Sequence, residues 1–566
     1  MKQKYIIVGT KIIGFVIVCF LAFSAAFGQY FRHFGYCYPT SGMNIDQKIW
    51  LIGAFLLSLL IIIIFCILLR CKIILPNLRL HWVNILYSNP LYLGIILFLL
   101  WGVILFLALP GLWNFDFTNQ MYELLGSSHG RMHSDIYPIA HFLFSKNSPE
   151  LTNQHGAFLT IIYDFFIYVS IKLFTSANPG IFFLSFSQLV LGVFALSYAL
   201  KKLYTKCSPI IKLIILLVIG LNPYFPIYLI QLTKTPLFAI NFLIFLTIFL
   251  QLRESEKYSK PKIILLFCTC FGMVIAVKFA FILLIPTIIV FSFLLNKNRK
   301  AFLFSTFSAI SIFKILMVLI SMSGLMKIDD PIEAKSIQIQ QVALYVKTYP
   351  NDLNKKDSDD LSKIFSIQGL QDFYDPRITD VIKSTGGFHY VYLYRTVTKS
   401  DWKNFNRVWF TMLKKHPKLF IQAFFAKTFG YFDILDLPRR DVADSGQIPF
   451  ILHKPKFYKY SISDYKKSQL KVIQEILDFY NTMPITSLLS RPNFWIVLTF
   501  IIISSKLIFT GDYKYFLSSV PFLLLMGVLI VSPVNNLDRY GISFFVLIPL
   551  IIPWFQENIA QKTPKT

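Results

Sequence analysis

The run WLIGAFLLSLLIIIIFCILL occupies residues 50–69 and contains no charged side chain. A second uncharged run, LYLGIILFLLWGVILFLAL, follows at residues 91–109. About 20 apolar residues in helical form are enough to cross the roughly 30 Å hydrocarbon core of a bilayer. The composition of the whole chain is also that of a membrane protein, because 55% of the 566 residues are hydrophobic and 58 are Phe. The sequence therefore predicts an all-α polytopic membrane protein.

Charge predicts the topology of the remaining apolar runs. Basic residues such as Arg70, Lys72 and Arg79 lie in short connectors, and connectors of this kind stay in the cytoplasm. This rule predicts about twelve transmembrane helices with both termini inside, in a multi-pass protein of the cell membrane. The expected spans are approximately 11–28, 50–69, 91–109, 181–200, 209–222, 235–251, 263–277, 279–295, 301–325, 492–508, 515–533 and 541–555.

The apolar run 158–174 has two possible placements. If it crosses the membrane, the basic connector after residue 200 becomes external. If it lies along the outer interface as an amphipathic helix, that connector stays inside. Asp164 and Lys172 favour the interface, since ionisable groups are costly at the bilayer centre. We therefore expect interfacial helices in the first large external loop, 110–180.

The polar segment 327–491 is too long to be a simple connector. Ile339, Val342, Ala343 and Val346 recur at the spacing of one helix face, and Gly386 begins a Gly-Gly pair that suggests a turn. We expect a mainly helical external domain at 327–491. It lies between an amino-terminal transmembrane region, 1–326, and a carboxy-terminal one, 492–566.

The formal charge of +26 does not indicate a nucleic-acid partner. The basic residues are spread along the chain, and many lie in connectors between apolar runs. Such residues suit the cytoplasmic side of a membrane and contact with anionic membrane lipid. We expect membrane lipid and not nucleic acid as a partner.

Several cations are expected at the outer membrane boundary. Lys234 and Lys278 lie at external ends of predicted spans, and Arg539 lies in the last external loop. Cations there can neutralise a lipid-linked phosphate where water is scarce. The alternative is that each side chain extends to the interface without a specific ligand.

A carboxylate, Asp116, follows the span at 91–109 and also faces outward in this topology. A positioned carboxylate can take a proton from an acceptor hydroxyl. It can also simply cap a short helix.

The polar interval 110–160 holds four histidines, and a metal site is one interpretation of them. His129 and His133 have the spacing of adjacent helical turns, but Gly126 and Gly130 argue against a helix. A divalent metal site is therefore the less favoured alternative to solvated loop histidines, and we expect no cofactor. A Gly-rich phosphate loop is absent, so a nucleotide-sugar donor is not indicated.

A family resemblance lies in motifs spread over most of the chain. They are PGLWNFDFTNQ (110–120), NQHGAFLT (153–160), NPYFPIYLIQLTKTPLF (222–238), EAKSIQIQQVALYV (333–346), YDPRITDVIK (374–383), KKHPKLFIQAFFAKTFGY (414–431) and DRYGISF (538–544). In this order they resemble the GT-C type of integral-membrane glycosyltransferase, specifically a poorly characterised subgroup from Gram-positive bacteria.

The resemblance implies transfer of a sugar from a polyprenyl-phosphate carrier to an acceptor at the extracytoplasmic face, such as a cell-wall glycopolymer. It implies that Asp116 is the catalytic carboxylate, with Gln120 beside it in the substrate site. Lys234 and Arg539 correspond to basic positions that face the carrier phosphate, and Lys278 stands where relatives often have Arg.

The chain departs from the resemblance at residues 153–156. Relatives have Asp-His-His-Pro, whereas this chain has Asn153, Gln154, His155 and Gly156. His155 keeps a family position in the substrate site, but a second loop carboxylate is missing, which puts metal dependence, acceptor choice and activity in question.

A different class of function is a transporter or flippase of lipid-linked sugars. It predicts broken helices near the bilayer midplane in two related halves. Asn222, Pro223 and Pro226 give one break, with no matching one in a second half.

Overall fold

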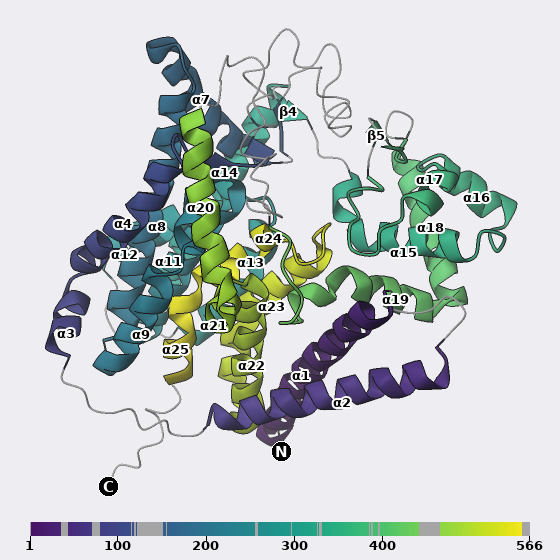
Figure 1. The fold of residues 1–566 in the computed structure, drawn as a ribbon, viewed down its shortest axis with the longest axis horizontal. Coiled ribbons are helices and arrows are strands. Elements are labelled where there is room, and N and C mark those ends of the chain that lie inside the picture. The colour runs from purple at the N-terminus through teal and green to yellow at the C-terminus, as the bar shows by residue number, and fades with distance from the viewer. Residues whose placement is uncertain are drawn as a thin grey trace.

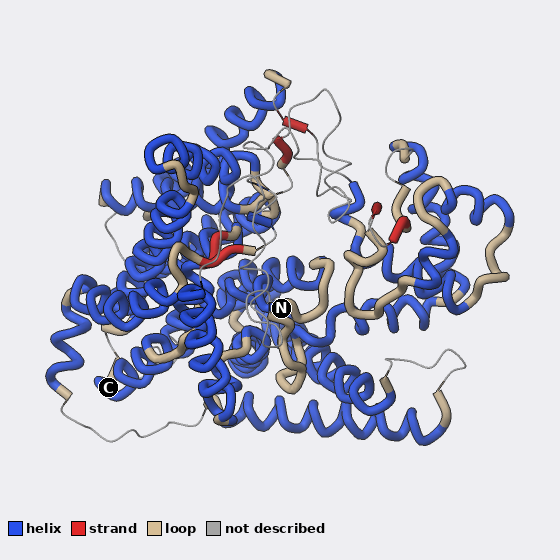
Figure 2. The backbone as a smooth tube through the Cα atoms, turned by 45° about the horizontal axis from the view of Figure 1, so that its top comes forward, coloured by secondary structure: helices blue, strands red, loops and turns tan. Residues whose placement is uncertain are grey.

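The computed structural model describes most of the chain. The described residues are 2–35, 43–70, 80–114, 116–117, 120, 151–153, 155–205, 207–254, 259–295, 297–324, 326–327, 331–383, 385–386, 389–393, 397–440 and 464–556. Helices make up nearly all of the regular structure, and strands occur only as short segments (Figure 2).

Nine helices of the described residues are long and apolar enough to cross a membrane. They are α1 (Lys2–Phe34), α2 (Ile45–Leu68), α4 (Pro90–Leu107), α7 (Ala157–Phe174), α8 (Asn178–Leu203), α11 (Lys234–Glu254), α14 (Arg299–Met322), α22 (Pro492–Thr510) and α23 (Tyr513–Val531). The prediction of an all-α polytopic membrane protein is confirmed.

The ends of these helices follow from local sequence. At α2, the Asn44 side chain accepts a hydrogen bond from the Gln47 backbone, and the Gln47 side chain accepts one from the Asn44 backbone. At α4, Asn89 caps the first turn and Pro90 occupies its start. At the carboxy-terminal end of α22, Gly511 adopts φ +64°, a left-handed conformation that glycine reaches without strain.

Other predicted spans form helices that are shorter or broken. They are α9 (Pro209–Gly220), α10 (Tyr224–Ile230), α12 (Lys260–Ala276), α13 (Ala280–Leu294), α24 (Asp538–Val546) and α25 (Ile548–Gln556). The pair α9 and α10 is bent by 56° and together raises the number of candidate spans to ten within the described part of the chain. Every predicted span therefore coincides with helix, while the total of about twelve stays a prediction.

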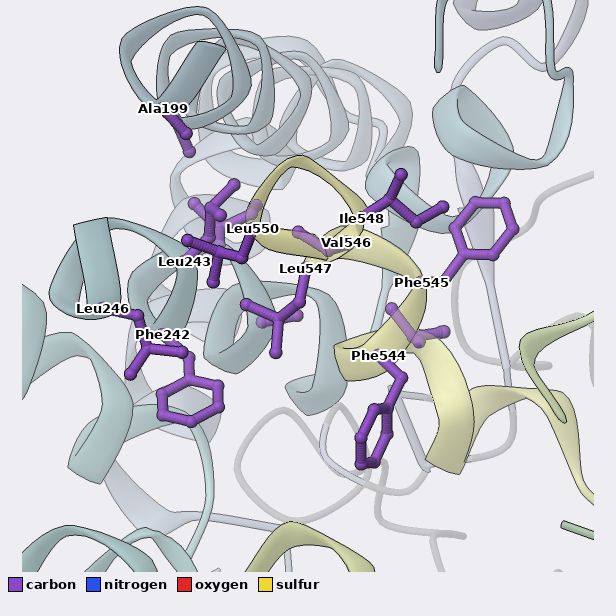
Figure 3. Packing of buried hydrophobic residues seen from close by; sticks show 14 of the residues in the cluster. Ala199, Phe242, Leu243, Leu246, Phe544, Phe545, Val546, Leu547, Ile548 and Leu550 are labelled. Carbon is purple, nitrogen blue, oxygen red and sulfur yellow. The ribbon is translucent and has the colours of Figure 1, made fainter. Parts of the chain in front are cut away.

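The largest hydrophobic core lies among the apolar helices, with α11 near its centre. Helix α11 packs against α8, α12 and α24, and nearly all of its apolar side chains are buried. Figure 3 shows this packing, in which Phe242 and Leu243 of α11 lie near the chain from Phe544 to Leu550. Burial on this scale fixes the ends of α11 and α24, where the candidate site lies.

A second hydrophobic core belongs to the segment after α14. It contains Ile339, Val342, Ala343 and Val346, all fully buried on α15, as the helical spacing predicts. Its elements are η2 (Pro331–Ala334), α15 (Ser336–Thr348), α16 (Lys355–Ser362), α17 (Ile367–Asp372), α18 (Lys399–Lys415) and α19 (Pro417–Thr428). Figure 1 shows α15 to α18 as a group set apart from the apolar helices.

The rest of this segment is also mainly helical. It contains η3 (Phe429–Tyr431), α20 (Asp464–Thr482) and α21 (Pro484–Leu489), and α3 (His81–Ser88) completes the helices of the described chain. Strands β5 (Thr385–Gly386) and β6 (His389–Tyr390) pair antiparallel on either side of the predicted turn, whose Gly387 lies outside the described residues.

Two parallel strand pairs join distant segments. Strand β1 (Leu112–Trp113) pairs with β3 (Gln231–Leu232), and β2 (Leu151–Thr152) pairs with β4 (Met326–Lys327). Strands β1, β2 and β3 are followed within three residues by Asp116, His155 and Lys234, respectively. These pairs therefore set the geometry of the candidate site.

The run 158–174 forms the helix α7, which packs against α8. Its length and composition also fit a membrane crossing. Its placement along the interface stays a prediction.

Candidate functional site

Asp116 is positioned by the short connection between α4 and β1. Gly111 has φ +156°, and a Cβ there would lie 2.2 Å from Ser185 Oγ on α8, so only glycine allows this close approach. Beyond β1, Phe117 is fully buried and its ring meets Tyr163 of α7 edge-on at 5.4 Å. The buried neighbour fixes the backbone of Asp116 while its carboxylate stays 13% exposed.

The pairing of β1 with β3 brings Asp116 to the start of α11. Trp113 pairs with Leu232, and Lys234 follows two residues later as the first residue of α11. Lys234 Nζ lies 3.1 Å from Asp116 Oδ2. An ion pair between residues 118 positions apart thus rests on a two-residue strand contact.

Arg539 completes the environment of this carboxylate from α24. Its Nη1 lies 3.3 Å from Asp116 Oδ1, and its Nη2 donates a hydrogen bond to the Tyr540 hydroxyl at 3.0 Å. The preceding residue, Asp538, is buried and accepts a hydrogen bond from the Tyr228 hydroxyl at 3.1 Å. Asp116 therefore contacts one cation with each carboxylate oxygen.

His155 lies on the same carboxylate from the loop between β2 and α7. Its Nδ1 is 3.7 Å from Asp116 Oδ2 and 3.5 Å from Lys234 Nζ. An ammonium only donates and an ionised carboxylate only accepts, so Nδ1 faces a donor and an acceptor at the same time. The next residue, Gly156, has φ +91° and would place a Cβ 3.0 Å from the Ile275 carbonyl oxygen, so glycine is needed to seat this loop on the end of α12.

The electrostatics of the cluster keep Asp116 ionised and His155 neutral. Burial alone would raise the pKa of the Asp116 carboxyl, but the charges of Arg539 and Lys234 hold that pKa well below its usual range. Burial lowers the pKa of His155, Lys234 and Lys278 lower it further, and Asp116 opposes them. The resting cluster is thus one carboxylate between two cations, next to a neutral imidazole.

The buried His155 makes stability depend on pH. Because its pKa is lower in the folded protein, the unfolded chain binds more protons on acidification, so stability is complete above about pH 6.5 and decreases as pH falls below it. We expect the apparent melting temperature in detergent to decrease between pH 7 and pH 5. The melting temperature of His155→Gln should decrease less over the same range. The control His81→Gln changes an exposed histidine at the start of α3, and its melting temperature should depend on pH as that of wild type does. The same change in melting temperature with pH in all three proteins would contradict the role of His155 in this pH dependence.

The other two predicted site residues, Gln120 and Lys278, lie nearby. Gln120 is buried, and its Nε2 donates to Thr160 Oγ1 of α7 at 3.0 Å. Lys278 is exposed in the turn between α12 and α13, and its charge acts on His155. The structure brings Asp116, His155, Lys234 and Arg539 into one cluster and places these two at its border.

An ion pair that sequence reasoning missed adjoins the cluster. Glu333 of η2 accepts from Lys383 Nζ at 3.1 Å, and Lys234 and Lys278 both act on the Glu333 carboxyl. These residues begin the motif at 333–346 and end the motif at 374–383. Their positions in these motifs could have marked both residues as candidates. Their distance along the sequence from residue 116, however, gave no sign that they lie near it in the fold.

The comparison with protein-family models gives one result for the whole chain. Residues 1–566 match DUF6020, described as a family of unknown function. The chain belongs to this family. Among curated proteins and among solved structures nothing matches.

In this DUF6020 protein a second charged cluster holds the segment that leads to Arg539. Asp436 accepts hydrogen bonds from Arg377 Nη2 at 2.6 Å and from Asn536 Nδ2 at 2.8 Å. Arg32 of α1 lies 2.6 Å from Asp433 and 3.9 Å from Asp436. This cluster, Arg32, Arg377, Asp433, Asp436 and Asn536, is called the latch below; it joins α1, the second core and the chain before α24.

The metal alternative receives no support within the described residues. Among them no group of three or more His, Cys, Asp or Glu side chains could hold a metal ion. His129 and His133, on which that alternative depends, lie outside the described part of the DUF6020 chain.

Proposed function

We propose that this protein is a GT-C type glycosyltransferase that moves a sugar from a polyprenyl-phosphate carrier to an extracytoplasmic acceptor such as a cell-wall glycopolymer. The observation that carries the proposal is the position of Asp116, whose two oxygens lie 3.1 Å from Lys234 and 3.3 Å from Arg539. A carboxylate able to accept a proton and two cations able to bind a phosphate occupy one place at the ends of apolar helices.

The proposed reaction is a single displacement. The acceptor oxygen attacks the anomeric carbon, and the bond from that carbon to the carrier phosphate oxygen breaks. The bonding electron pair leaves with the phosphate, and the acceptor proton passes to Asp116. Lys234 and Arg539 stabilise the charge that develops on the leaving phosphate, with Lys278 at the border of the site.

The resting ion pairs explain how a weakly basic carboxylate can serve in this reaction. With both cations bound to it, the pKa of the Asp116 carboxyl is too low for efficient proton transfer. A carrier phosphate competes for the same cations and draws them from Asp116. Its negative charge then raises the pKa of that carboxyl, so the base becomes effective when the donor is bound.

The proposed orientation follows the charge of the connectors. The chain crosses the membrane about twelve times, the cluster faces the extracytoplasmic side, and 327–491 is an external domain that covers the site and selects the acceptor. Helix α7 lies along the outer interface beside Asp116, because the exposed Lys172 suits that depth, whereas Asp164 is buried in the protein and does not decide it. His155 and Gln120 line the substrate site.

A transporter or flippase of lipid-linked sugars is the second candidate. One observation favours it, the 56° bend between α9 and α10 at Asn222 and Pro223, because broken helices often bind transported substrates. Yet α10 is buried throughout, and its Tyr228 holds Asp538 next to Arg539. Helix α10, which follows the bend, therefore helps to position Arg539 in the proposed catalytic cluster.

A transfer assay separates the two candidates. The purified protein is incubated with polyprenyl-phosphate sugars and with glycopolymer released by mild acid from Gram-positive cell walls, and free polyprenyl phosphate is measured. A transferase releases it in proportion to sugar added to the polymer. A transporter in vesicles moves the intact donor across the membrane and releases none, which is the result that would overturn the proposal.

A further inference from the structure

Glu333 has one carboxylate oxygen that is fully engaged and one that is not. Oε2 accepts the hydrogen bond from Lys383 Nζ at 3.1 Å, and the Lys383 side chain is only 1% exposed. Oε1 is buried and has no hydrogen-bond partner among the described residues, although the whole side chain remains 22% exposed. A buried acceptor without a partner is unfavourable, so such an atom indicates a ligand or a water.

Lys383 keeps Glu333 charged and in place. It also lies 3.5 Å from Asp380, whose side chain is 45% exposed. Burial alone would raise the pKa of the Glu333 carboxyl, but the charge and hydrogen bond of Lys383 lower it below its usual value. An ionised carboxylate only accepts hydrogen bonds, so its ligand must be a donor.

Two backbone pairings place this carboxylate beside the proposed catalytic cluster. The pairing of β2 with β4 sets the chain entering η2 alongside the His155 loop. A bridge between Ile378 and Val534, with a hydrogen bond from the Thr379 amide to the Pro533 carbonyl at 2.8 Å, sets the chain leading to Lys383 alongside the segment before Arg539. Glu333 and Lys383 therefore lie where both segments approach the same site.

We propose that Glu333, held by Lys383, binds hydroxyl groups of the acceptor through its free Oε1. The inference rests on the proposed function and names the chemistry of its second substrate. A hydroxyl-rich sugar or polyol supplies the donors that this oxygen lacks, whereas the anionic carrier phosphate is repelled by it and is attracted to Lys234 and Arg539. Glu333 takes no part in bond making.

The kinetic test uses Glu333→Gln, which keeps the shape of the side chain and removes its charge, while Asp380 at 3.5 Å remains a charge partner for the buried Lys383. We expect the KM for the acid-released glycopolymer to rise about tenfold, because a hydrogen bond to a charged group exceeds one to a neutral group by an energy equal to about tenfold in affinity. The donor KM should stay within about twofold of wild type, since Lys234 and Arg539 bind the carrier phosphate in this proposal.

The matched control is Asp380→Asn, which removes the other carboxylate near Lys383 and should leave both KM values unchanged. If Glu333→Gln instead raises the donor KM and the acceptor KM equally, Glu333 supports the fold of the site and the inference is wrong.

A labelling experiment gives a readout that does not require turnover. Water-soluble carbodiimide with glycine ethyl ester modifies accessible carboxylates, and mass spectrometry measures the modification at Glu333 and Asp380. The glycopolymer should protect Glu333 and leave Asp380 unprotected. Equal modification of Glu333 with and without glycopolymer, or no modification in either sample, overturns the inference. A wild-type protein that transfers no sugar overturns the proposed function instead, so the two failures are distinguishable.

Discussion

Asp116→Asn is expected to abolish measurable sugar transfer while the protein still folds and inserts. Asparagine keeps the size of the side chain but cannot accept the proton of the attacking hydroxyl. The loss of a general base lowers turnover by about 10²–10⁴-fold. The same change frees Lys234 and Arg539, which contact the carboxylate at 3.1 and 3.3 Å, to bind a phosphate without competition.

This variant therefore has two opposite readouts. Turnover is measured as release of polyprenyl phosphate, and inhibition is measured by adding polyprenyl phosphate at the start. We expect inhibition to become tighter, by about fivefold for an ion pair of about 1 kcal/mol. Asp359→Asn, at an exposed aspartate of α16, is the control and should behave as wild type. Full activity in Asp116→Asn would remove the central residue of the proposal.

Asp436→Asn is expected to destabilise the protein strongly. Asp436 is 4% exposed and lies 2.6 Å from Arg377, so its neutralisation leaves a largely buried guanidinium without its charge partner. Removing one partner from a buried ion pair costs about 3–5 kcal/mol. Activity should fall as well, because Asn536 loses its contact with this carboxylate and the chain before Arg539 is no longer held.

An exposed ion pair provides the comparison for that experiment. Lys471 lies 3.9 Å from Glu475 on α20, and their side chains are 78% and 64% exposed. Lys471→Gln should leave the apparent melting temperature in detergent near that of wild type, since solvent screens exposed pairs. If both variants lower the melting temperature equally, burial is not what makes the latch strong.

Much of the fold was accessible from the sequence because the membrane imposes strong patterns. Long apolar runs predicted segments that the structure shows as helix, and the spacing of Ile339 and Val346 predicted a buried helix face. The number of crossings was harder to predict. Helix α13 has 15 residues, and α24 and α25 have 9 each, so length does not decide whether these short elements span the bilayer.

The sequence predicted which residues belong to the candidate site better than it predicted how they are arranged. Polar residues at the ends of apolar runs selected Asp116, Lys234 and Arg539, and the structure brings these three together. The contacts depend on tertiary pairing, above all that of β1 with β3, and two-residue strands leave no periodic signal in a sequence. Glu333 was missed for the same reason, since its approach to the site depends on β2 and β4.

The packing of α1 against α22 has a consequence for how the protein is made. Helix α1 leaves the ribosome long before α22, one of its main neighbours, which begins at Pro492. Arg32 contacts Asp433, which lies 401 residues later. At a synthesis rate of about 5–20 residues per second, α1 waits roughly 20–80 s for that contact. During this time its polar residues must be shielded by the insertion machinery or by neighbouring nascent helices. Chains truncated before α22 should therefore be recognised and degraded early, even though their first helices have already entered the membrane.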